Sequence, residues 1–199
     1  NHQMIEALLS LITATALLLG SPGPAPLALA AIGATYGVRK GLSFLIGILA
    51  GLACAIVGAV VGLSTLFAAF PTVKFACQLI GGAYIVYIAF KIAGAPIVEN
   101  TAPQLPPTFN DGFILNLLNP KAYAAFLAIF SQFLLPMTSE VTAYVATGVV
   151  CWLVAMIVDA IWLGFGALLR PIFAHPQQAR SIRIVFALLM VSAVVFALI

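Results

Sequence analysis

Residues 5–36 read IEALLSLITATALLLGSPGPAPLALAAIGATY, an apolar run that is interrupted at Ser21-Pro22-Gly23-Pro24. Residues 112–135 read GFILNLLNPKAYAAFLAIFSQFLL and carry a second interruption at Asn119-Pro120-Lys121. A helix crosses the hydrocarbon core of a bilayer with about 20 apolar residues, so each run is long enough to span a membrane. Proline lacks an N–H, and its ring clashes with the carbonyl group four residues earlier. Each run is therefore predicted to be a broken helix.

Further apolar segments bring the expected number of membrane spans to six. They cover about residues 42–70, 73–94, 142–169 and 182–199, and a polar, proline-rich connection occupies 95–111. The 199-residue chain is 64% hydrophobic and 7% charged, whereas an ordinary soluble domain is about 25% charged. The sequence therefore predicts an all-α integral membrane protein with a single transmembrane domain over residues 1–199.

The two broken spans divide the chain into halves of three spans each, about residues 4–94 and 112–199. Because three is an odd number, the second half must cross the membrane in the opposite sense from the first. Inverted repeats of this kind occur in many secondary transporters, in which broken helices meet near the membrane midplane and form the substrate site. We therefore expect two inverted three-helix repeats with broken first and fourth helices.

The few charged residues predict the orientation in the membrane, because Lys and Arg concentrate in cytoplasmic loops. The basic residues near the first, third and fifth gaps between spans are Arg39, Lys40, Lys91, Arg170, Arg180 and Arg183, whereas the other side has only Lys74. Both termini are therefore predicted outside the cytoplasm. The first ten residues lack the basic region of a signal peptide, so we expect the first apolar segment to be retained. The net charge of +3 forms no basic face, so nucleic acid is not an expected partner.

The helix breaks are candidate binding sites. The half-helices that begin after them would point free N–H groups and positive dipole ends into the protein, where they suit a carboxylate. The prolines would also free the carbonyl groups of Leu18, Gly20 and Asn116. Unpaired carbonyl groups are costly in hydrocarbon, so the breaks are expected to face protein or a wet cavity. A simple kink that helps the helices to pack is the alternative interpretation.

Polar side chains follow the second break. On a continuous helix Asn116, Asn119 and Tyr123 would fall within about 60° and form one polar face. Lys121 would be costly inside a span unless it is paired, exposed to water or extended to the near membrane boundary. Extension to the boundary and binding of an anionic substrate group both remain open for this lysine.

Asp159 is the only acidic residue deep within an expected span. It shares an arc of about 80° with Trp152, Ala155, Trp162 and Gly166, which indicates a face turned toward protein or a cavity. A carboxylate there could bind the ammonium group of a substrate or carry a proton during transport. Alternatively, Asp159 pairs with Lys121 or Arg170 and only stabilises the fold.

Small residues and cysteines indicate packing more than chemistry. A stripe within about 80° on the second span suits close helix packing, either inside one chain or in a homo-oligomer; it comprises Gly47, Gly51, Ala55, Gly58 and Gly62. The cysteines, Cys54, Cys77 and Cys151, lack the spacing of a disulfide framework or a zinc site. No metal, cofactor or nucleotide-binding signature is therefore expected.

Together these motifs resemble the lysine exporter / homoserine-threonine resistance (LysE/RhtB) family of bacterial amino-acid exporters. The resemblance covers almost the whole chain. It is carried by Ser21 to Pro24, Gly37 to Gly41 with Gly47 and Gly51, Gly82-Ala83-Tyr84, Gly112-Phe113, Asn116 to Ala122, and Asp159 followed by Trp162. The P-G-P and N-P-K elements are fairly specific in combination, because they stand about 100 residues apart on a frame of six spans.

The resemblance implies a transporter of the bacterial cytoplasmic membrane, not an enzyme, that exports cationic or small neutral amino acids by proton antiport. We expect the breaks at Pro22, Gly23, Pro24 and Pro120, together with Lys121, to hold the substrate carboxylate. Asn116, Asn119 and Asp159 would hold its amino group, and Asp159 would carry the proton. Export of metal ions or other small solutes on a related frame is the alternative, but a divalent ion would need several carboxylate, His or Cys ligands together.

Overall fold

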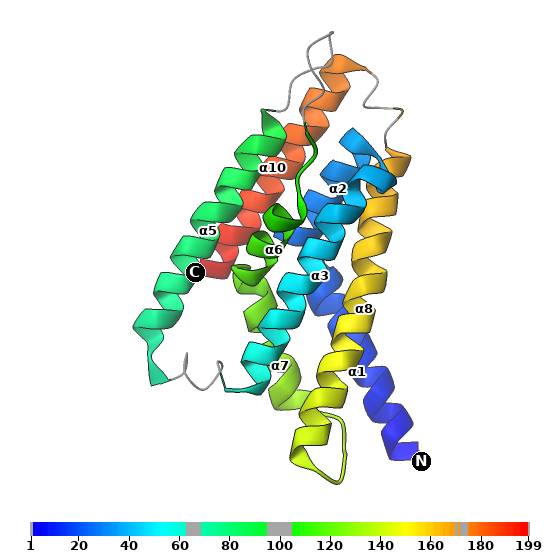
Figure 1. The fold of residues 1–199 in the computed structure, drawn as a ribbon, viewed down its shortest axis with the longest axis vertical. Helices are drawn as coiled ribbons and strands as arrows, with labels where there is room; N and C mark the ends of the chain where they lie inside the picture. The colour runs from blue at the N-terminus through cyan, green and yellow to red at the C-terminus, as the bar shows by residue number, and fades with distance from the viewer. Residues whose placement is uncertain (1, 63–68, 95–104, 170, 172–174, 199) are drawn as a thin grey trace.

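The computed structural model describes residues 2–62, 69–94, 105–169, 171 and 175–198, and their regular secondary structure is helical, as predicted. In chain order the helices are α1 (His2–Gly20), α2 (Pro24–Tyr36), α3 (Val38–Val60), α5 (Pro71–Ala93), α6 (Phe109–Leu117), α7 (Pro120–Gln132), α8 (Glu140–Leu168) and α10 (Pro176–Leu198) (Figure 1). Among the described residues, α1, α3 and α8 are long and apolar enough to cross a membrane. The bent pair α6–α7 raises the number of candidate spans to 4.

Both predicted helix breaks are confirmed. Helix α1 ends at Gly20 and α2 begins at Pro24, while α6 ends at Leu117 and α7 begins at Pro120 after a bend of 53°. A proline occupies the first position of both α2 and α7. At that position its missing N–H has no intrahelical partner to lose, and its fixed φ suits the start of a helix.

Several helix boundaries differ from those expected. Helix α6 begins at Phe109, three residues before the expected start of the span, because a capping box fixes its first turn. There the Thr108 N–H donates to the Asp111 carboxylate at 2.8 Å, and the Asp111 N–H donates back to the Thr108 hydroxyl at 3.4 Å. Helix α10 begins at Pro176, before the expected residue 182. Most of the expected connection, residues 95–104, lies outside the described residues.

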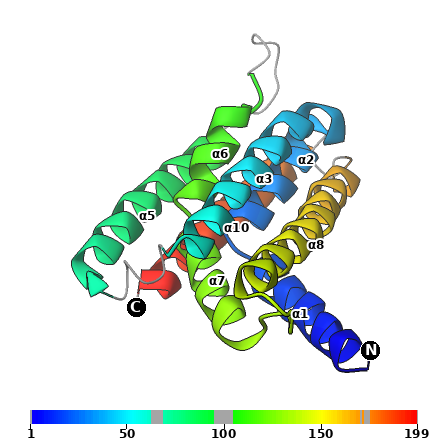
Figure 2. The same cartoon turned by 60° about the horizontal axis from the view of Figure 1, so that its bottom comes forward.

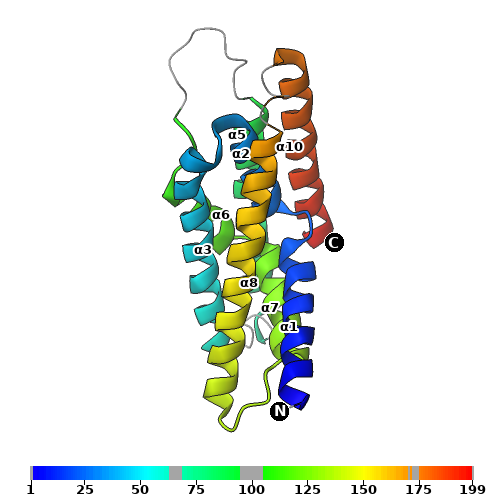
Figure 3. The same ribbon diagram turned by 90° about the vertical axis from the view of Figure 1, so that its right-hand side faces the viewer.

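The helices form an elongated bundle in which the two broken pairs run in opposite directions (Figures 1 and 3). Helix α3 packs against α6, and α8 packs against both α1 and α2. Helices α5 and α10 lie side by side (Figure 1), and α5 and α8 lie on opposite sides of the bundle (Figure 2). Helix α2 is the most enclosed, because every residue from Pro24 to Ala34 is buried.

Glycines allow the closest helix contacts. A Cβ atom at Gly47 would overlap the backbone of α6 at Phe109, and one at Gly51 would come close to the same helix. Gly33 of α2 and Gly166 of α8 likewise face the backbone of the opposite helix. Gly47 and Gly51 of the predicted small-residue stripe therefore serve packing within the chain.

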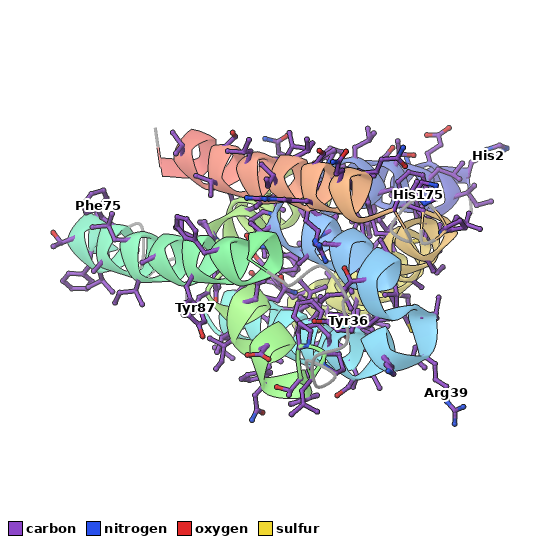
Figure 4. The ribbon with its side chains drawn as sticks, turned by 90° about the horizontal axis from the view of Figure 1, so that it is seen from above. His2, Tyr36, Arg39, Phe75, Tyr87 and His175 are labelled. Carbon is purple, nitrogen blue, oxygen red and sulfur yellow. The ribbon has the colours of Figure 1, made fainter. Side chains whose placement is uncertain are left out.

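Basic residues gather at the end of the bundle that carries the α2–α3 link, the last turn of α8 and the first turn of α10. Arg39, Lys40 and Arg180 are exposed, and Figure 4, viewed from this end, shows Arg39 extending away from the helices. Arg183 lies within α10 and, unlike these three, is only 4% exposed. Arg170 lies outside the described residues.

Candidate functional site

The two helix breaks meet at a small cavity between α1, α2, α3, α6, α7 and α8. Its volume is about 20 Å³. The residues that line it are Leu19, Ala25, Pro26, Leu52, Asn116, Asn119, Lys121, Ala122, Ala155 and Asp159. The polar and charged members are the Asn, Lys and Asp side chains predicted from the sequence. Among the predicted break residues, Gly23, Pro24 and Pro120 are buried, whereas Pro22 is exposed.

Lys121 connects the two breaks. It is the second residue of α7, and its ammonium group donates a hydrogen bond to the carbonyl oxygen of Ser21, 100 residues earlier. The missing side chain of Gly23 makes room for it, because a Cβ atom there would lie 2.8 Å from Lys121 Cδ and 2.9 Å from Nζ. The Lys121 side chain therefore extends across to the other break, beside the start of α2.

Asp159 stands on α8 in the wall of the same cavity and is 6% exposed. Within the described residues, its carboxylate makes no hydrogen bond and no direct ion pair, but it interacts electrostatically with the ammonium group of Lys121. The two opposite charges thus belong to one site without touching.

Asn116 and Asn119 form a chain of hydrogen bonds that braces the second break. Asn116 Nδ2 donates to the Ile48 carbonyl at 2.8 Å, and Asn119 Nδ2 donates to Asn116 Oδ1 at 3.3 Å. Asn119 Oδ1 accepts the N–H of Lys121 at 3.1 Å and so caps α7. An amide oxygen has two lone pairs and an amide NH₂ has two protons, so both side chains keep bonding capacity toward the cavity.

Tyr123 does not share the polar face that was predicted for it. Its hydroxyl donates to the Leu117 carbonyl at 2.6 Å, at the end of α6. The prediction assumed one continuous helix through Asn116, Asn119 and Tyr123, and the break with its 53° bend removes that geometry. The tyrosine instead satisfies a carbonyl group that the break exposes.

The carbonyl groups predicted to lose their helical partners all accept other hydrogen bonds. The partners are the Ser21 hydroxyl for Leu18 (3.3 Å), the Trp162 indole N–H for Gly20 (3.0 Å) and the Asn119 N–H for Asn116 (3.1 Å). Protein groups therefore offset the cost of opening the helices inside a membrane.

The N-terminal ends of α2 and α7 differ in the donors they present. The first turn of α2 reads Pro24-Ala25-Pro26, so Ala25 supplies its single N–H group, and Ala25 lines the cavity. In α7 the N–H groups of Lys121 and Ala122 are both used by Asn119. The start of α2 thus presents one N–H group to the cavity, beside the Lys121 ammonium group.

Sequence reasoning missed the apolar walls of the cavity and one buried cation. Leu52 lines the cavity, although nothing in an apolar span marks it as different from lipid-facing neighbours, whereas Ala155 lies on the Asp159 face that was predicted to turn toward protein or a cavity. Arg183 is buried in α10. Its position inside the apolar segment 182–199 was the available signal.

Comparisons with known proteins agree with the resemblance. Among the relatives, the homoserine/homoserine lactone efflux protein of Salmonella typhimurium is 31% identical over 189 residues, which cover 88% of this chain and 87% of the relative. The cysteine/O-acetylserine efflux proteins of Salmonella choleraesuis and Escherichia coli strain K12 are 27% and 29% identical, and each match covers 86% of this chain and 87% of the relative.

No solved structure matches the chain. The model of a family of translocators, described as LysE type translocator, matches residues 16–199. The chain therefore belongs to the LysE type translocator family, a family of transporters and not of enzymes.

Proposed function

We propose that this protein exports amino acids from the cytoplasm through the cavity between its two helix breaks. One observation carries the proposal: Lys121 and Asp159 place an ammonium group and a carboxylate in the wall of one cavity. These charges complement the carboxylate and ammonium groups of an α-amino acid. Membership of a translocator family and the amino-acid efflux named for the relatives support the same substrate class.

In the proposed complex the substrate carboxylate binds the Lys121 ammonium group and the Ala25 N–H at the start of α2. The substrate ammonium group binds Asp159, and the remaining amide capacity of Asn116 and Asn119 adds hydrogen bonds. Gly23, Pro24 and Pro120 shape the breaks, and Pro22 separates α1 from α2.

The two-repeat arrangement is part of the proposal. Exchanging α1, α2, α3 and α5 for α6, α7, α8 and α10 converts most helix contacts into other observed contacts. For example, α3–α6 becomes α8–α1, α2–α8 becomes α7–α3, and α2–α10 becomes α7–α5, while α3–α8 and α5–α10 are converted into themselves. The opposite directions of the two broken pairs in Figure 1 support an inverted relation.

The cavity volume implies that transport needs a conformational change. A volume of about 20 Å³ holds a water molecule but not an amino acid. The helices around the breaks must therefore separate to admit the substrate, first on the cytoplasmic side and then on the other. The breaks are the natural hinges, because the backbone there is already free of the helical hydrogen-bond ladder.

Proton antiport follows from the chemistry of Asp159. Its carboxylate can hold a substrate ammonium group or a proton, but both would compete for the same oxygens. A proton that enters from outside displaces the amino acid, and release of that proton into the cytoplasm restores the site. We expect an inward proton gradient to drive export, with the basic end of the bundle facing the cytoplasm and both termini outside in the bacterial inner membrane.

The proposal is tested by efflux of preloaded, labelled homoserine, cysteine and lysine from proteoliposomes, with the external pH equal to or one unit below the internal pH. We expect the wild type to release at least one amino acid faster under the gradient. Lys121→Ala should lower the efflux by at least tenfold, because the carboxylate loses its charged partner. Asp159→Asn should abolish the response to the gradient, because the amide takes up no proton.

Gly164→Ala is the matched control, because a Cβ atom at Gly164 meets nothing within 4 Å. This variant should export as the wild type does. Gradient-driven efflux at the wild-type rate in Asp159→Asn would disprove the role of Asp159 as proton carrier. Absence of amino-acid efflux from the wild type, with release of a metal ion in a parallel assay, would favour the alternative function.

A further inference from the structure

Ala155 occupies a distinctive place in the wall of the cavity. It lies four residues before Asp159 on α8, on the same face of the helix, and is only 2% exposed. We infer that Ala155 determines the size of the side chain that the exported amino acid carries. The inference rests on the proposed function, in which Asp159 binds the substrate ammonium group.

The covalent structure of an α-amino acid ties the position of its side chain to that of its ammonium group. The side chain branches from the carbon atom that also bears the ammonium group, so binding that group at Asp159 fixes where the side chain begins. Residues four apart on a helix have Cβ atoms about 5–6 Å apart. Ala155 therefore stands one helical turn from the group at which the substrate side chain begins, in the wall of the same cavity.

The surroundings of Ala155 define the chemistry of this part of the cavity. Leu52 of α3 and Ala122 of α7 belong with Ala155 to one buried cluster, and both also line the cavity. In the described lining, Asp159 is the single acidic group, and the substrate ammonium group occupies it. The wall left for the side chain is apolar and offers no carboxylate to a second ammonium group, so it suits small uncharged side chains better than those of lysine or arginine.

The size of the side chain at position 155 determines how much room the opened cavity leaves for the substrate side chain. Ala155 lines the cavity together with Leu52 and Ala122, so a larger side chain at this position would occupy space that the opened cavity offers to the substrate. One methylene group more or less in an apolar pocket changes discrimination by about 10- to 200-fold. Ala155→Val and Ala155→Gly should therefore shift selectivity in opposite directions.

The experiment measures the ratio of methionine efflux to alanine efflux from proteoliposomes that contain the wild type, Ala155→Val or Ala155→Gly. We expect Ala155→Val to lower this ratio by about tenfold or more and Ala155→Gly to raise it. The matched controls are Ala143→Val and Ala143→Gly. Ala143 is a buried alanine on the same helix, three turns before Ala155, and does not line the cavity.

The outcomes separate this inference from the proposed function. Wild-type ratios in both Ala155 variants, with amino acids still exported, would overturn the role of Ala155 and leave the proposed function intact. An equal shift in the Ala143 variants would also overturn it. If the wild type exports no amino acid, both proposals fail. If Ala155→Val does not fold, Ala155→Gly alone decides, because it removes only a methyl group.

Discussion

At the level of single residues, the site depends on a side chain that is missing. The backbone of Gly23 is extended (φ −169°, ψ −174°), a conformation that any residue adopts, so glycine is not needed for the turn itself. It is needed for space, because a Cβ atom would lie 2.8 Å from Lys121 Cδ. Gly23 therefore allows the Lys121 ammonium group to reach the Ser21 carbonyl beside the start of α2.

Gly23→Ala should consequently change substrate binding more than stability. The new methyl group displaces the flexible end of Lys121, at little cost to the fold, and moves the ammonium group away from the substrate carboxylate. We expect the KM for efflux to rise by about tenfold, while the midpoint of thermal unfolding in detergent changes by a few degrees at most.

A double-mutant cycle tests whether this effect passes through the lysine. In a Lys121→Ala background, Gly23→Ala should have almost no further effect on the KM, because the group that it displaces is absent. Equal effects of Gly23→Ala in both backgrounds would show that glycine serves the backbone at the break and not the position of Lys121.

At the level of helices, the first break depends on a hydrogen bond from the other half of the chain. The Trp162 indole N–H donates to the carbonyl group of Gly20, the last residue of α1. The Trp152 indole N–H makes a bond of similar length to the Leu49 carbonyl, but Leu49 lies in the interior of α3, where its carbonyl also has an intrahelical partner. Both indoles therefore donate to a backbone carbonyl group, but only the carbonyl group of Gly20 lacks a helical partner.

Trp162→Phe should destabilise the protein more than Trp152→Phe. It leaves the Gly20 carbonyl without its partner, which costs about 1–3 kcal/mol, whereas the Leu49 carbonyl keeps its helical hydrogen bond. We expect a lower midpoint of thermal unfolding in detergent for Trp162→Phe and a smaller decrease for Trp152→Phe. Equal decreases would mean that the capping bond at Gly20 contributes nothing beyond the packing of an indole ring.

Close packing of α2 on α8 gives a second contrast between neighbouring positions. A methyl group at Gly166 would overlap the backbone of α2 at Ala30, so Gly166→Ala must push the helices apart. This overpacking should cost about 1–3 kcal/mol and lower the unfolding midpoint. Gly164→Ala meets no atom within 4 Å and should stabilise α8 by up to about 1 kcal/mol. A decrease of equal size in both variants would contradict the assigned contact.

The same helices show what the sequence could and could not predict. The positions of the breaks were predictable, because the missing N–H of Pro24 or Pro120 is a local property. The partner of the Gly20 carbonyl was not, since Trp162 stands 142 residues away and only the packing of α8 against α1 brings them together. The prediction of a polar face through Tyr123 was wrong because it assumed one continuous helix, whereas the chain forms two helices with a bend between them.

At the level of the whole molecule, the two proposed repeats are packed unequally. Helix α2 is enclosed along most of its length and lies closely against α8, whereas its counterpart α7 has exposed positions and a smaller contact with α3. On the proposed mechanism, the repeats would exchange these two arrangements during transport. The access path would then close at one end of the bundle and open at the other.

Which end faces the cytoplasm decides whether that exchange leads to export. The exposed Arg39 and Gln177 lie at the basic end, and the exposed Met137 and Ser139 lie at the opposite end. In a variant without Cys54, Cys77 and Cys151, single cysteines at these four positions would be treated with a membrane-impermeant maleimide. We expect labelling at residues 137 and 139 in intact cells, and at 39 and 177 only after permeabilisation, because basic loops are retained in the cytoplasm. The reverse pattern would place both termini in the cytoplasm, and Asp159 would then receive its proton from the opposite side in the proposed cycle.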